Sequence, residues 1–293
     1  MIEQATIETT DGCFATINGK IHPPGRYVSI ISYIPFQPWH PYNLVSKKMI
    51  GGKDYTKISR TWFPAYRDCY FEYVAGSGFG HYMHEDNFFG KITAIPHNRI
   101  KRIIEPIPVS GPAIEACSVL GVDPNYAVLL ASSTLDCNEN GDVDIGIIGR
   151  NAAKKAFRQL HKLVENPKRQ VYHDYFRRAH PRQFYCSRRK IDIFSLYGDE
   201  AGPIESAFEV GEEVVVNDIV ADNTDAAFCP AIYRLQNGLF VTYQIEHRMV
   251  LMPGDRIQAH AKRAPTGDIF LVRAGDRYED ITGGKYVFED PGF

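Results

Sequence analysis

Residues 136–149, DCNENGDVDIGIIG, place an acid-rich loop directly before a segment in which acidic and apolar residues alternate. Alternation with a period of two predicts a β-strand, with Asp142 and Asp144 on one face and Val143 and Ile145 on the other. Two neighbouring carboxylates repel each other unless a cation lies between them. The segment therefore predicts a strand with a hydrophobic core on one side and a cation site on the other.

The same stretch also matches part of the calcium-loop pattern of EF-hands. Asp136, Asn138 and Asn140 fall at loop positions one, three and five. An EF-hand also needs a glutamate at position twelve and helices on both sides. Position twelve is Ile147, and the flanking residues are typical of strands. We therefore favour Mg²⁺, which binds one or two carboxylates together with water and substrate phosphates.

A third carboxylate follows in the strand-like segment RKIDIF, after a helical pattern at residues 151–166. Asp192 lies there between Ile191 and Ile193, so its face of the strand is expected to border a site rather than the core. Lys190 shares that face by alternation, where a cation balances phosphate charge. Together with Asp142 and Asp144, Asp192 predicts a two-metal site for in-line displacement at phosphorus.

Composition restricts the class of protein. The chain has 293 residues, 44% hydrophobic, with a formal net charge of −2, so no global basic field recruits nucleic acid. Six scattered cysteines without a CxxC pair argue against a zinc knuckle and a disulfide scaffold. Residues 1–12 lack the regions of a signal peptide, and no apolar run approaches the roughly 18 residues of a membrane helix. We expect a cytoplasmic protein with reduced thiols and no membrane association.

Strand and helix signals divide the chain into three parts. Residues 1–105 are rich in β-formers and turn residues, and residues 106–202 mix short apolar strands with helical patterns. From residue 203 to residue 293 short strands return between Gly, Pro, Asn and Asp turns. This spacing predicts a C-terminal β-rich domain that forms a small barrel or a sandwich.

The motifs of the middle part resemble the nucleotidyltransferase superfamily that includes DNA polymerase beta. The family pattern is Gly-Ser, nine residues, then Asp-x-Asp. In this chain Ser132 precedes nine residues, STLDCNENG, and then Asp142-Val143-Asp144, while Ala131 stands where the family has glycine. The resemblance implies an α+β fold in which a nucleotidyltransferase-type mixed sheet with helices is flanked by the β-rich N- and C-terminal regions.

The same resemblance implies roles for individual residues. Ser132, with Ser133 offering a second hydroxyl, contacts the phosphates of a nucleoside triphosphate. Asp142 and Asp144 ligate Mg²⁺ or Mn²⁺, and Asp192 serves one metal and helps to activate the acceptor.

Further motifs extend the resemblance over more of the chain. IETTDGCFATINGKIHPPGRYVSIISYIP, RIKRIIEP and IVADNTDAAFCPAIYRL, together with the Asp-x-Asp segment, are similar in that order to an uncharacterised group of archaeal and bacterial predicted nucleotidyltransferases. We therefore expect an Mg-dependent enzyme that moves an NMP from an NTP to an acceptor hydroxyl and releases pyrophosphate. The alternative is a catalytically degenerate nucleotide-binding or regulatory module, because alanine in place of glycine at 131 hinders close approach of the backbone to phosphate. The sequence leaves open the NTP, the oligomeric state and the acceptor (a small molecule, an RNA end or a protein side chain).

Two other segments offer competing sites. HYMHEDNFFG carries His81, His84 and Glu85, but a zinc site needs a further ligand, and a polar loop over the active site is the preferred interpretation. Residues 168–190 interleave basic and aromatic side chains and fit a triphosphate clamp, an RNA-facing surface, or a solvated helix face with a loop. The basic residues are Lys168, Arg169, Arg177, Arg178, Arg182, Arg188, Arg189 and Lys190.

Overall fold

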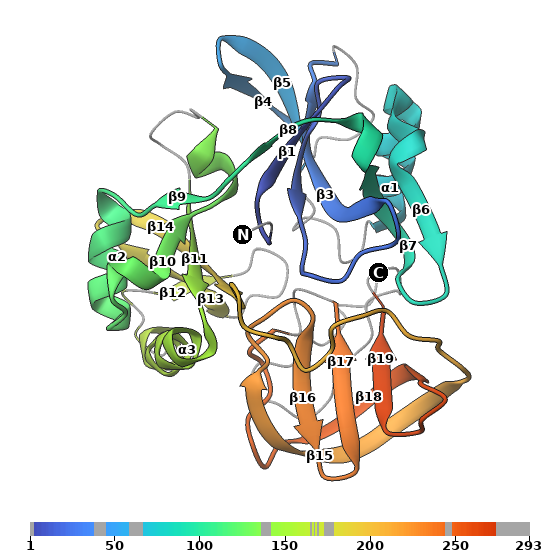
Figure 1. Ribbon diagram of the computed structural model, residues 1–293. Coiled ribbons are helices and arrows are strands. Elements are labelled where there is room, and N and C mark those ends of the chain that lie inside the picture. Colours follow the sequence, from blue (N-terminus) through green and yellow to red (C-terminus); the bar gives the residue numbers. More distant parts are fainter. Residues whose placement is uncertain are drawn as a thin grey trace.

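The computed structural model describes residues 3–37, 45–58, 67–135, 142–164, 166, 168, 170–172, 179–243 and 248–273 (Figure 1). Side chains within this part are described except at residues 45, 46, 67–69, 131, 132, 164, 170–172 and 179–181. In the described residues the strands form three β-sheets, one of them a closed barrel, and three α-helices are present.

The first sheet is built from the N-terminal third of the chain. Its eight strands are β1 (Thr6–Thr9), β2 (Phe14–Ile17), β3 (Arg26–Pro35), β4 (Val45–Ile50), β5 (Lys53–Ile58), β6 (Met83–Asp86), β7 (Gly90–Pro96) and β8 (Ile100–Ile104). The main path runs β4-β5-β3-β2-β1-β8, and β7 joins β3 to β6. Helix α1 (Arg67–Val74) packs on this sheet, where Tyr70 and Val74 meet Ile7 and Ile31 in a buried cluster.

The second sheet contains the predicted site. Its six strands run in the order β12 (Gln170–Tyr172), β13 (Ala179–Cys186), β14 (Arg189–Leu196), β11 (Val143–Ile148), β10 (Ala127–Leu129) and β9 (Ile107–Pro108). Only β11 and β14 pair in parallel, and α3 (Arg150–Val164) follows β11 directly. The neighbouring pairs are antiparallel.

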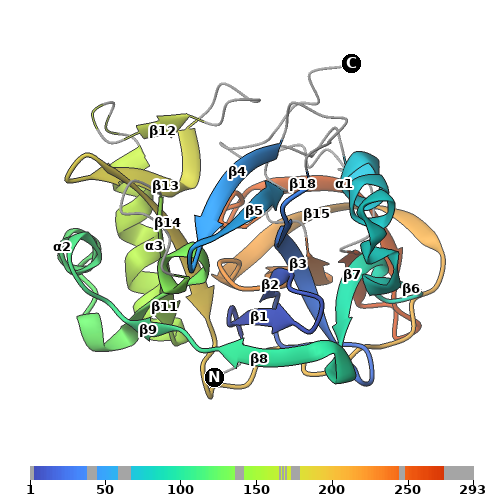
Figure 2. The same cartoon turned by 90° about the horizontal axis from the view of Figure 1, so that it is seen from above.

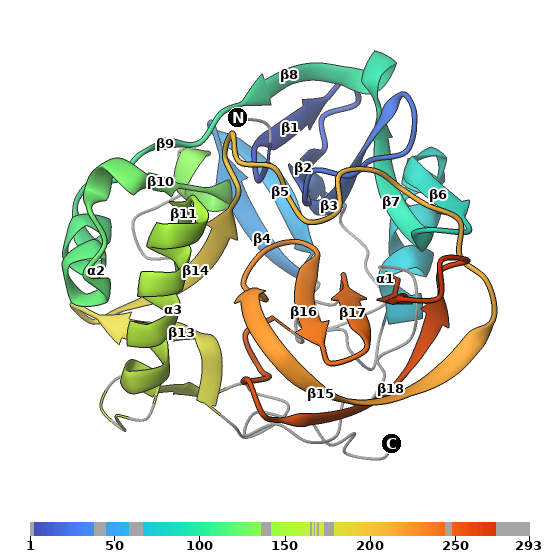
Figure 3. The ribbon, with the colours of Figure 1, turned by 60° about the horizontal axis from the view of Figure 1, so that its bottom comes forward.

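Helices cover one face of this second sheet. Helix α2 (Pro112–Leu120) and α3 pack there (Figures 1 and 3). Ile145 of β11 and Ile193 of β14 lie in the same buried cluster as Leu120 and Phe157 of the helices. Because side chains alternate along a strand, Asp144 and Asp192 are presented on the opposite, helix-free face.

The third sheet is a closed barrel in the order β15-β16-β17-β19-β18. Its strands are β15 (Glu213–Asp225), β16 (Ala231–Leu235), β17 (Gly238–Thr242), β18 (Arg256–Arg263) and β19 (Ile269–Val272). The long β15 pairs with both β16 and β18, and β17 pairs in parallel with β19. This is a five-stranded Greek-key barrel, the type of architecture seen in OB-folds.

One face of the barrel is covered by the N-terminal sheet. OB-folds bind oligonucleotides and oligosaccharides on the face of their second and third strands. Here Ile232 of β16 and Val241 of β17 share a buried cluster with Val28 of β3 and Ile92 of β7. A second buried cluster joins the barrel residue Phe228 to the second sheet. The barrel therefore uses that face to hold the fold together.

The α+β prediction is wrong, because the protein is predominantly β. Three sheets, one of them a barrel, account for most of the described structure, and of the three described α-helices two cover one face of the second sheet while α1 packs on the first. Part of the physical reason lies at residues 170–186, which the sequence indicated as a basic helix face or loop. Residues 170–172 and 179–186 form β12 and β13 and add two strands where a helix-flanked fold was expected.

A buried glutamate just before β1 is hydrogen-bonded to the chain at the end of the second sheet. Glu3 accepts a hydrogen bond from the backbone N–H of Tyr197, just beyond β14, at 3.0 Å. Its other carboxylate oxygen makes no hydrogen bond within the described part of the chain. Burial raises the pKa of Glu3 to about 7, although the Tyr197 bond and the charges of Lys20 and Arg248 oppose the shift. The ionised form is therefore disfavoured in the folded protein.

Glu3→Gln is expected to make the protein more stable than wild type at pH 8 but not at pH 4.5. A carboxyl group whose folded pKa lies above its unfolded value contributes stability below about pH 4.5 and loses it as pH rises through about 7. Glutamine still accepts the Tyr197 bond and carries no charge. The expected gain at pH 8 is about 2–3 kcal/mol, measured by urea unfolding at both pH values. A difference independent of pH would show that the charge of Glu3 is not the cause.

The described cysteines and helices bear on the predictions of thiol state and membrane association. The four cysteines whose side chains are described, Cys13, Cys117, Cys186 and Cys229, are buried, and none of these four is in a disulfide bond. Within the described residues, no helix combines the length and apolar character needed to cross a membrane.

Candidate functional site

The pairing of β11 with β14 brings the predicted aspartates together. In the parallel register Asp144 lies opposite Asp192, with Val143 opposite Ile191 and Ile145 opposite Ile193. Asp142 directly precedes β11, and its charge acts on Asp144. Asp192, distant in sequence, therefore shares one end of the helix-free face with Asp142 and Asp144.

Asp192 is held by two side chains of the neighbouring strand β13. Gln183 donates a hydrogen bond from Nε2 to Asp192 Oδ2 at 2.8 Å, and Arg182 Nη1 lies 3.2 Å from Oδ1. Arg182 is only 2% exposed, and its guanidinium lies over the ring of Phe194 at 5.0 Å. A buried arginine at this position fixes the third carboxylate and balances its charge.

Lys190 forms an ion pair with the first aspartate. Its Nζ lies 2.6 Å from Asp142 Oδ2, and both side chains remain partly exposed. Burial opposes ionisation of Lys190, but the contact with Asp142 and the charges of Asp192 and Asp144 raise its pKa above the usual value. Lys190 therefore stays charged next to the carboxylates.

Asp144 is the most strongly perturbed member of the group. It retains partial solvent access, yet desolvation by the surrounding protein raises its pKa to about 7. The negative charges of Asp192 and Asp142 act in the same direction, while Lys57 and Lys190 act against it. This charge imbalance around Asp144 is one that a bound cation would relieve.

Gly146 allows close packing on the same face. A β-carbon at this position would lie 2.7 Å from Leu196 Cδ1, 3.0 Å from Val128 Cγ2 and 3.1 Å from Leu130 Cδ2. Alternation places Val128 and Leu196 on the same face of the sheet as Asp144 and Asp192. Only glycine fits there without displacing the buried side chains.

Gly146→Ala is therefore expected to destabilise the protein by about 1–3 kcal/mol through overpacking. Gly76→Ala is the matched control, because a β-carbon at Gly76 meets no atom within 4 Å. Thermal and urea unfolding of both variants measure the effect. Equal stability of Gly146→Ala and wild type would mean that the neighbouring leucines move aside without cost.

The predicted phosphate-binding serines lie in the 3₁₀ turn η6 (Ala131–Thr134). The side chains of Ala131 and Ser132 lie outside the described part. Ser133 is partly buried, and its backbone N–H donates to the Leu130 carbonyl at 3.0 Å. That amide is thus used within the turn rather than presented to a phosphate. Residues 136–141, which carry most of the calcium-loop pattern, also lie outside the described residues.

The donor set is the kind that Mg²⁺ prefers, since it consists of carboxylate oxygens. Asp192 Oδ1 is buried and makes no hydrogen bond to any described group. However, across the described ranges no three His, Cys, Asp or Glu side chains converge as ligands of one ion. Instead, Lys190 forms an ion pair with Asp142, and Arg182 forms one with Asp192. The residues fit a divalent cation chemically once Lys190 turns away from Asp142.

Sequence reasoning missed the residues that hold Asp192. Arg182 was grouped with a basic surface, and Gln183 was not considered. The hairpin register could have identified Gln183, because the Ser187–Arg188 turn places it opposite Asp192. It could not have identified Arg182, because alternation assigns this adjacent residue to the other face of β13. Arg188 is exposed at that turn, whereas Arg169, Arg177 and Arg178 lie outside the described residues.

The histidine-rich segment lies elsewhere. His81 Nε2 is 3.0 Å from Asp11, and His84 Nε2 is 2.9 Å from Asp86, so the two histidines have separate partners. The segment forms a 3₁₀ turn and β6, on the opposite side of the N-terminal sheet from β11 (Figures 1 and 3). It is not a loop over the aspartates.

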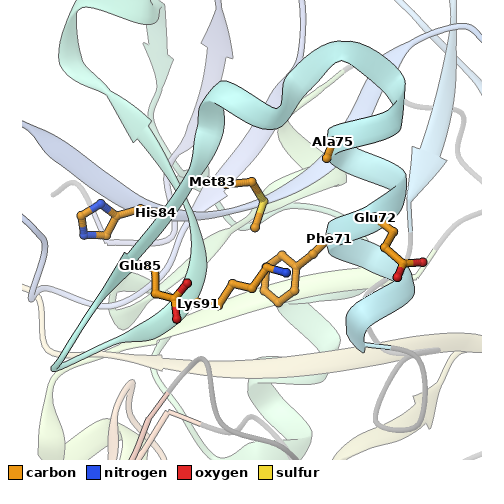
Figure 4. Close-up of a pocket in the computed structure, with 7 residues that line it drawn as sticks. All are labelled: Phe71, Glu72, Ala75, Met83, His84, Glu85 and Lys91. Carbon is orange, nitrogen blue, oxygen red and sulfur yellow. The ribbon is translucent and has the colours of Figure 1, made fainter.

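A cavity of about 340 Å³ lies beside this segment, between α1, β6 and β7 (Figure 4). It is lined by Phe71, Glu72, Ala75, Met83, His84, Glu85 and Lys91. The Lys91 ammonium lies 5.1 Å from the centre of the Phe71 ring. The lining mixes both charges with apolar groups and contains none of the predicted site residues.

Comparison with known proteins gives one distant likeness. An uncharacterised protein of Methanocaldococcus jannaschii is 25% identical over 213 residues, which cover 65% of this chain and 60% of that protein. The aligned part thus spans less than two thirds of the relative. No family model matches the chain, and no solved structure matches it. The resemblance to nucleotidyltransferases stays a prediction, because none of these comparisons bears on it.

Proposed function

We propose that the protein is a metal-dependent nucleotidyltransferase that moves an NMP from an NTP to an acceptor hydroxyl and releases pyrophosphate. The observation that supports this most is the register of β11 and β14. It puts Asp144 opposite Asp192, with Asp142 two residues before Asp144. Two-cation sites of phosphoryl transfer stabilise both the attacking and the leaving oxygens, and carboxylates that converge from two adjacent strands are suited to hold such ions.

When bound, Mg²⁺ or Mn²⁺ would neutralise charge on the phosphates and on the attacking oxygen. Asp142, Asp144 and Asp192 are the residues that would hold it. Asp192 is oriented for this role by Gln183 and Arg182. Lys190 is already beside these carboxylates and can exchange its contact with Asp142 for one with a phosphate.

The remaining chemistry is a balanced displacement. The acceptor oxygen forms a bond to the α-phosphorus while the bond from that phosphorus to the bridging oxygen breaks. Pyrophosphate leaves with the bonding electrons. The proton of the acceptor hydroxyl passes to a carboxylate oxygen, for which Asp192 is the proposed receiver. Positioning of the reactants supplies much of the rate in such reactions.

The acceptor is the open part of the proposal. A small molecule, an RNA end and a protein side chain all present a suitable hydroxyl. The net charge of −2 provides no long-range attraction for RNA, and the OB-like ligand face of the barrel is covered. These two observations favour a small-molecule acceptor.

A second candidate is a nucleotide-binding or regulatory module without turnover. It is favoured by the two ion pairs that occupy the carboxylates, Lys190 with Asp142 and Arg182 with Asp192. Alanine in place of glycine at position 131 also favours this candidate, because it hinders close approach of the backbone to a phosphate. Such a module would bind an NTP but would not transfer its NMP.

Pyrophosphate release distinguishes the two candidates. Each of the four common NTPs is incubated with Mg²⁺ or Mn²⁺ and a panel of hydroxyl compounds, short RNAs and proteins, and NTP binding is measured in parallel. The enzyme releases pyrophosphate with at least one combination. Binding without release in every combination supports the module, and absence of both contradicts the two candidates together.

A further inference from the structure

The N-terminal sheet contacts the loop that leads to the aspartates. Leu135, directly after η6, is buried in a cluster with Phe14, Tyr33, Ile50 and Tyr55 of the first sheet. Ile50 ends β4 and Tyr55 lies in β5, so the β4–β5 hairpin packs against this part of the second sheet. Figures 2 and 3 both place the hairpin between β14 and β3.

Lys57 lies on the face of β5 that meets the second sheet. Residues two apart on a strand share a face, so Lys57 is on the same side as Tyr55, which is buried in the same cluster as Leu135. Lys57 is exposed, and its charge acts on Asp144. Among the described residues it has no carboxylate within ion-pair distance, whereas Lys47 of β4 pairs with Asp54 at 2.7 Å.

The cations nearest the aspartates are already paired with carboxylates, so a bound triphosphate requires a further positive charge. Lys190 is paired with Asp142, and Arg182 is buried against Asp192. A nucleoside triphosphate brings several further negative charges next to these carboxylates. An exposed lysine on the facing sheet can meet those charges without giving up an existing partner. Charge-assisted contacts to phosphate are among the stronger hydrogen bonds in proteins.

We propose that Lys57 binds the phosphates of the nucleotide, so that the N-terminal sheet supplies part of the nucleotide site. This inference rests on the proposed function, because it assumes that the aspartates receive a nucleotide. It adds a residue from outside the second sheet, and it gives the β4–β5 hairpin a role in binding.

The test is equilibrium binding rather than turnover. Titration calorimetry follows the binding of Mg²⁺-ATP, and separately of Mg²⁺-tripolyphosphate, to the full-length wild type, Lys57→Ala, Lys57→Arg and Lys53→Ala. Lys53 is the matched control, since it is an exposed lysine on the same face of β5. It lies four residues from Lys57, which is about 13 Å along a strand.

Lys57→Ala is expected to weaken binding of both ligands roughly tenfold, the loss of one contact to a charged group. Lys57→Arg retains most of the affinity, and Lys53→Ala stays within about twofold of wild type, because an exposed charge at that distance is largely screened by salt. The loss in Lys57→Ala shrinks at high salt for the same reason.

Several results would overturn the inference. If wild type binds both ligands and Lys57→Ala binds them equally well, Lys57 has no role, while the proposed function survives. Equal losses in Lys57→Ala and Lys53→Ala would show a general charge effect and no specific contact. If wild type binds neither ligand, the proposed function fails and the inference fails with it.

Discussion

Asp144→Asn is expected to lower nucleotidyl transfer by roughly 10³-fold or more, the range in which a bound metal contributes to phosphoryl transfer. Asp144 lies at the centre of the three carboxylates, with Asp192 opposite and Asp142 two residues before it. An asparagine of the same shape keeps one oxygen ligand but removes the negative charge that a divalent cation requires. Asp142→Asn is expected to act in the same direction. Pyrophosphate release at saturating NTP and Mg²⁺ measures both.

Folding should survive this change. Burial and its two negative neighbours raise the pKa of Asp144 to about 7, so removing its charge relieves repulsion in the metal-free protein. Asp123→Asn is the matched control, because Asp123 is exposed and accepts a hydrogen bond from the Asn125 backbone that asparagine also accepts. If Asp144→Asn turned over at the wild-type rate, this carboxylate would have no part in the reaction.

Arg182→Met is expected to destabilise the protein by about 3–5 kcal/mol, the usual cost of removing one member of a buried ion pair. Arg182 is 2% exposed, and its Nη1 lies 3.2 Å from Asp192 Oδ1. Methionine is similar in volume, so the main loss is the charge that balances Asp192. Urea unfolding at neutral pH measures the change, with the exposed turn residue Arg188→Met as a control expected to stay within about 0.5 kcal/mol of wild type.

A double variant separates charge from packing. Asp192→Asn added to Arg182→Met removes the unbalanced carboxylate and should restore more than half of the lost stability. If the second change restores nothing, the cost of Arg182→Met comes from lost packing against Phe194 and from lost hydrogen bonds. Arg182 would then be a structural residue rather than a partner that holds Asp192 in place.

Some of the site follows from local patterns in the sequence. Alternation in DVDIGIIG predicted a strand with Ile145 in the core, and the structure buries Ile145 against the helices. The same reasoning placed Asp192 in a strand between two apolar residues, and Ile191 and Ile193 are both buried. These features depend on residues a few positions apart, which sequence periodicity detects well.

Other long-range features did not follow from the sequence. It predicted that Asp192 joins Asp142 and Asp144, but not the parallel register that sets Asp144 opposite Asp192 across an intervening helix and two strands. Lys57 lies more than eighty residues before Asp144 in the chain, and no local motif connects them. Arg182 is a residue type that is usually exposed, so only its pairing with Asp192 explains its burial.

The predicted fold class was also wrong because strand formation depended on long-range pairing. The prediction weighted the helical pattern around Phe157 and the family resemblance, and it treated residues 170–186 as a basic surface. Residues 170–172 and 179–186 form strands because β13 pairs with β14 and β12 pairs with β13, a tertiary preference that outweighs the local impression of a charged loop. The β-rich flanks also do more than surround the second sheet, because they share buried clusters with it and with each other.

A crystal structure with Mg²⁺ and a non-hydrolysable ATP analogue tests the central claim most directly. The claim predicts a Mg²⁺ ion with carboxylate oxygens of Asp142 and Asp144 at about 2.0–2.1 Å, an oxygen of Asp192 on a shared ion, and phosphate oxygens completing the shell. Lys190 should then have moved from Asp142 to a phosphate. A nucleotide bound elsewhere, with the Lys190–Asp142 and Arg182–Asp192 pairs intact and no ion between the aspartates, would contradict the account.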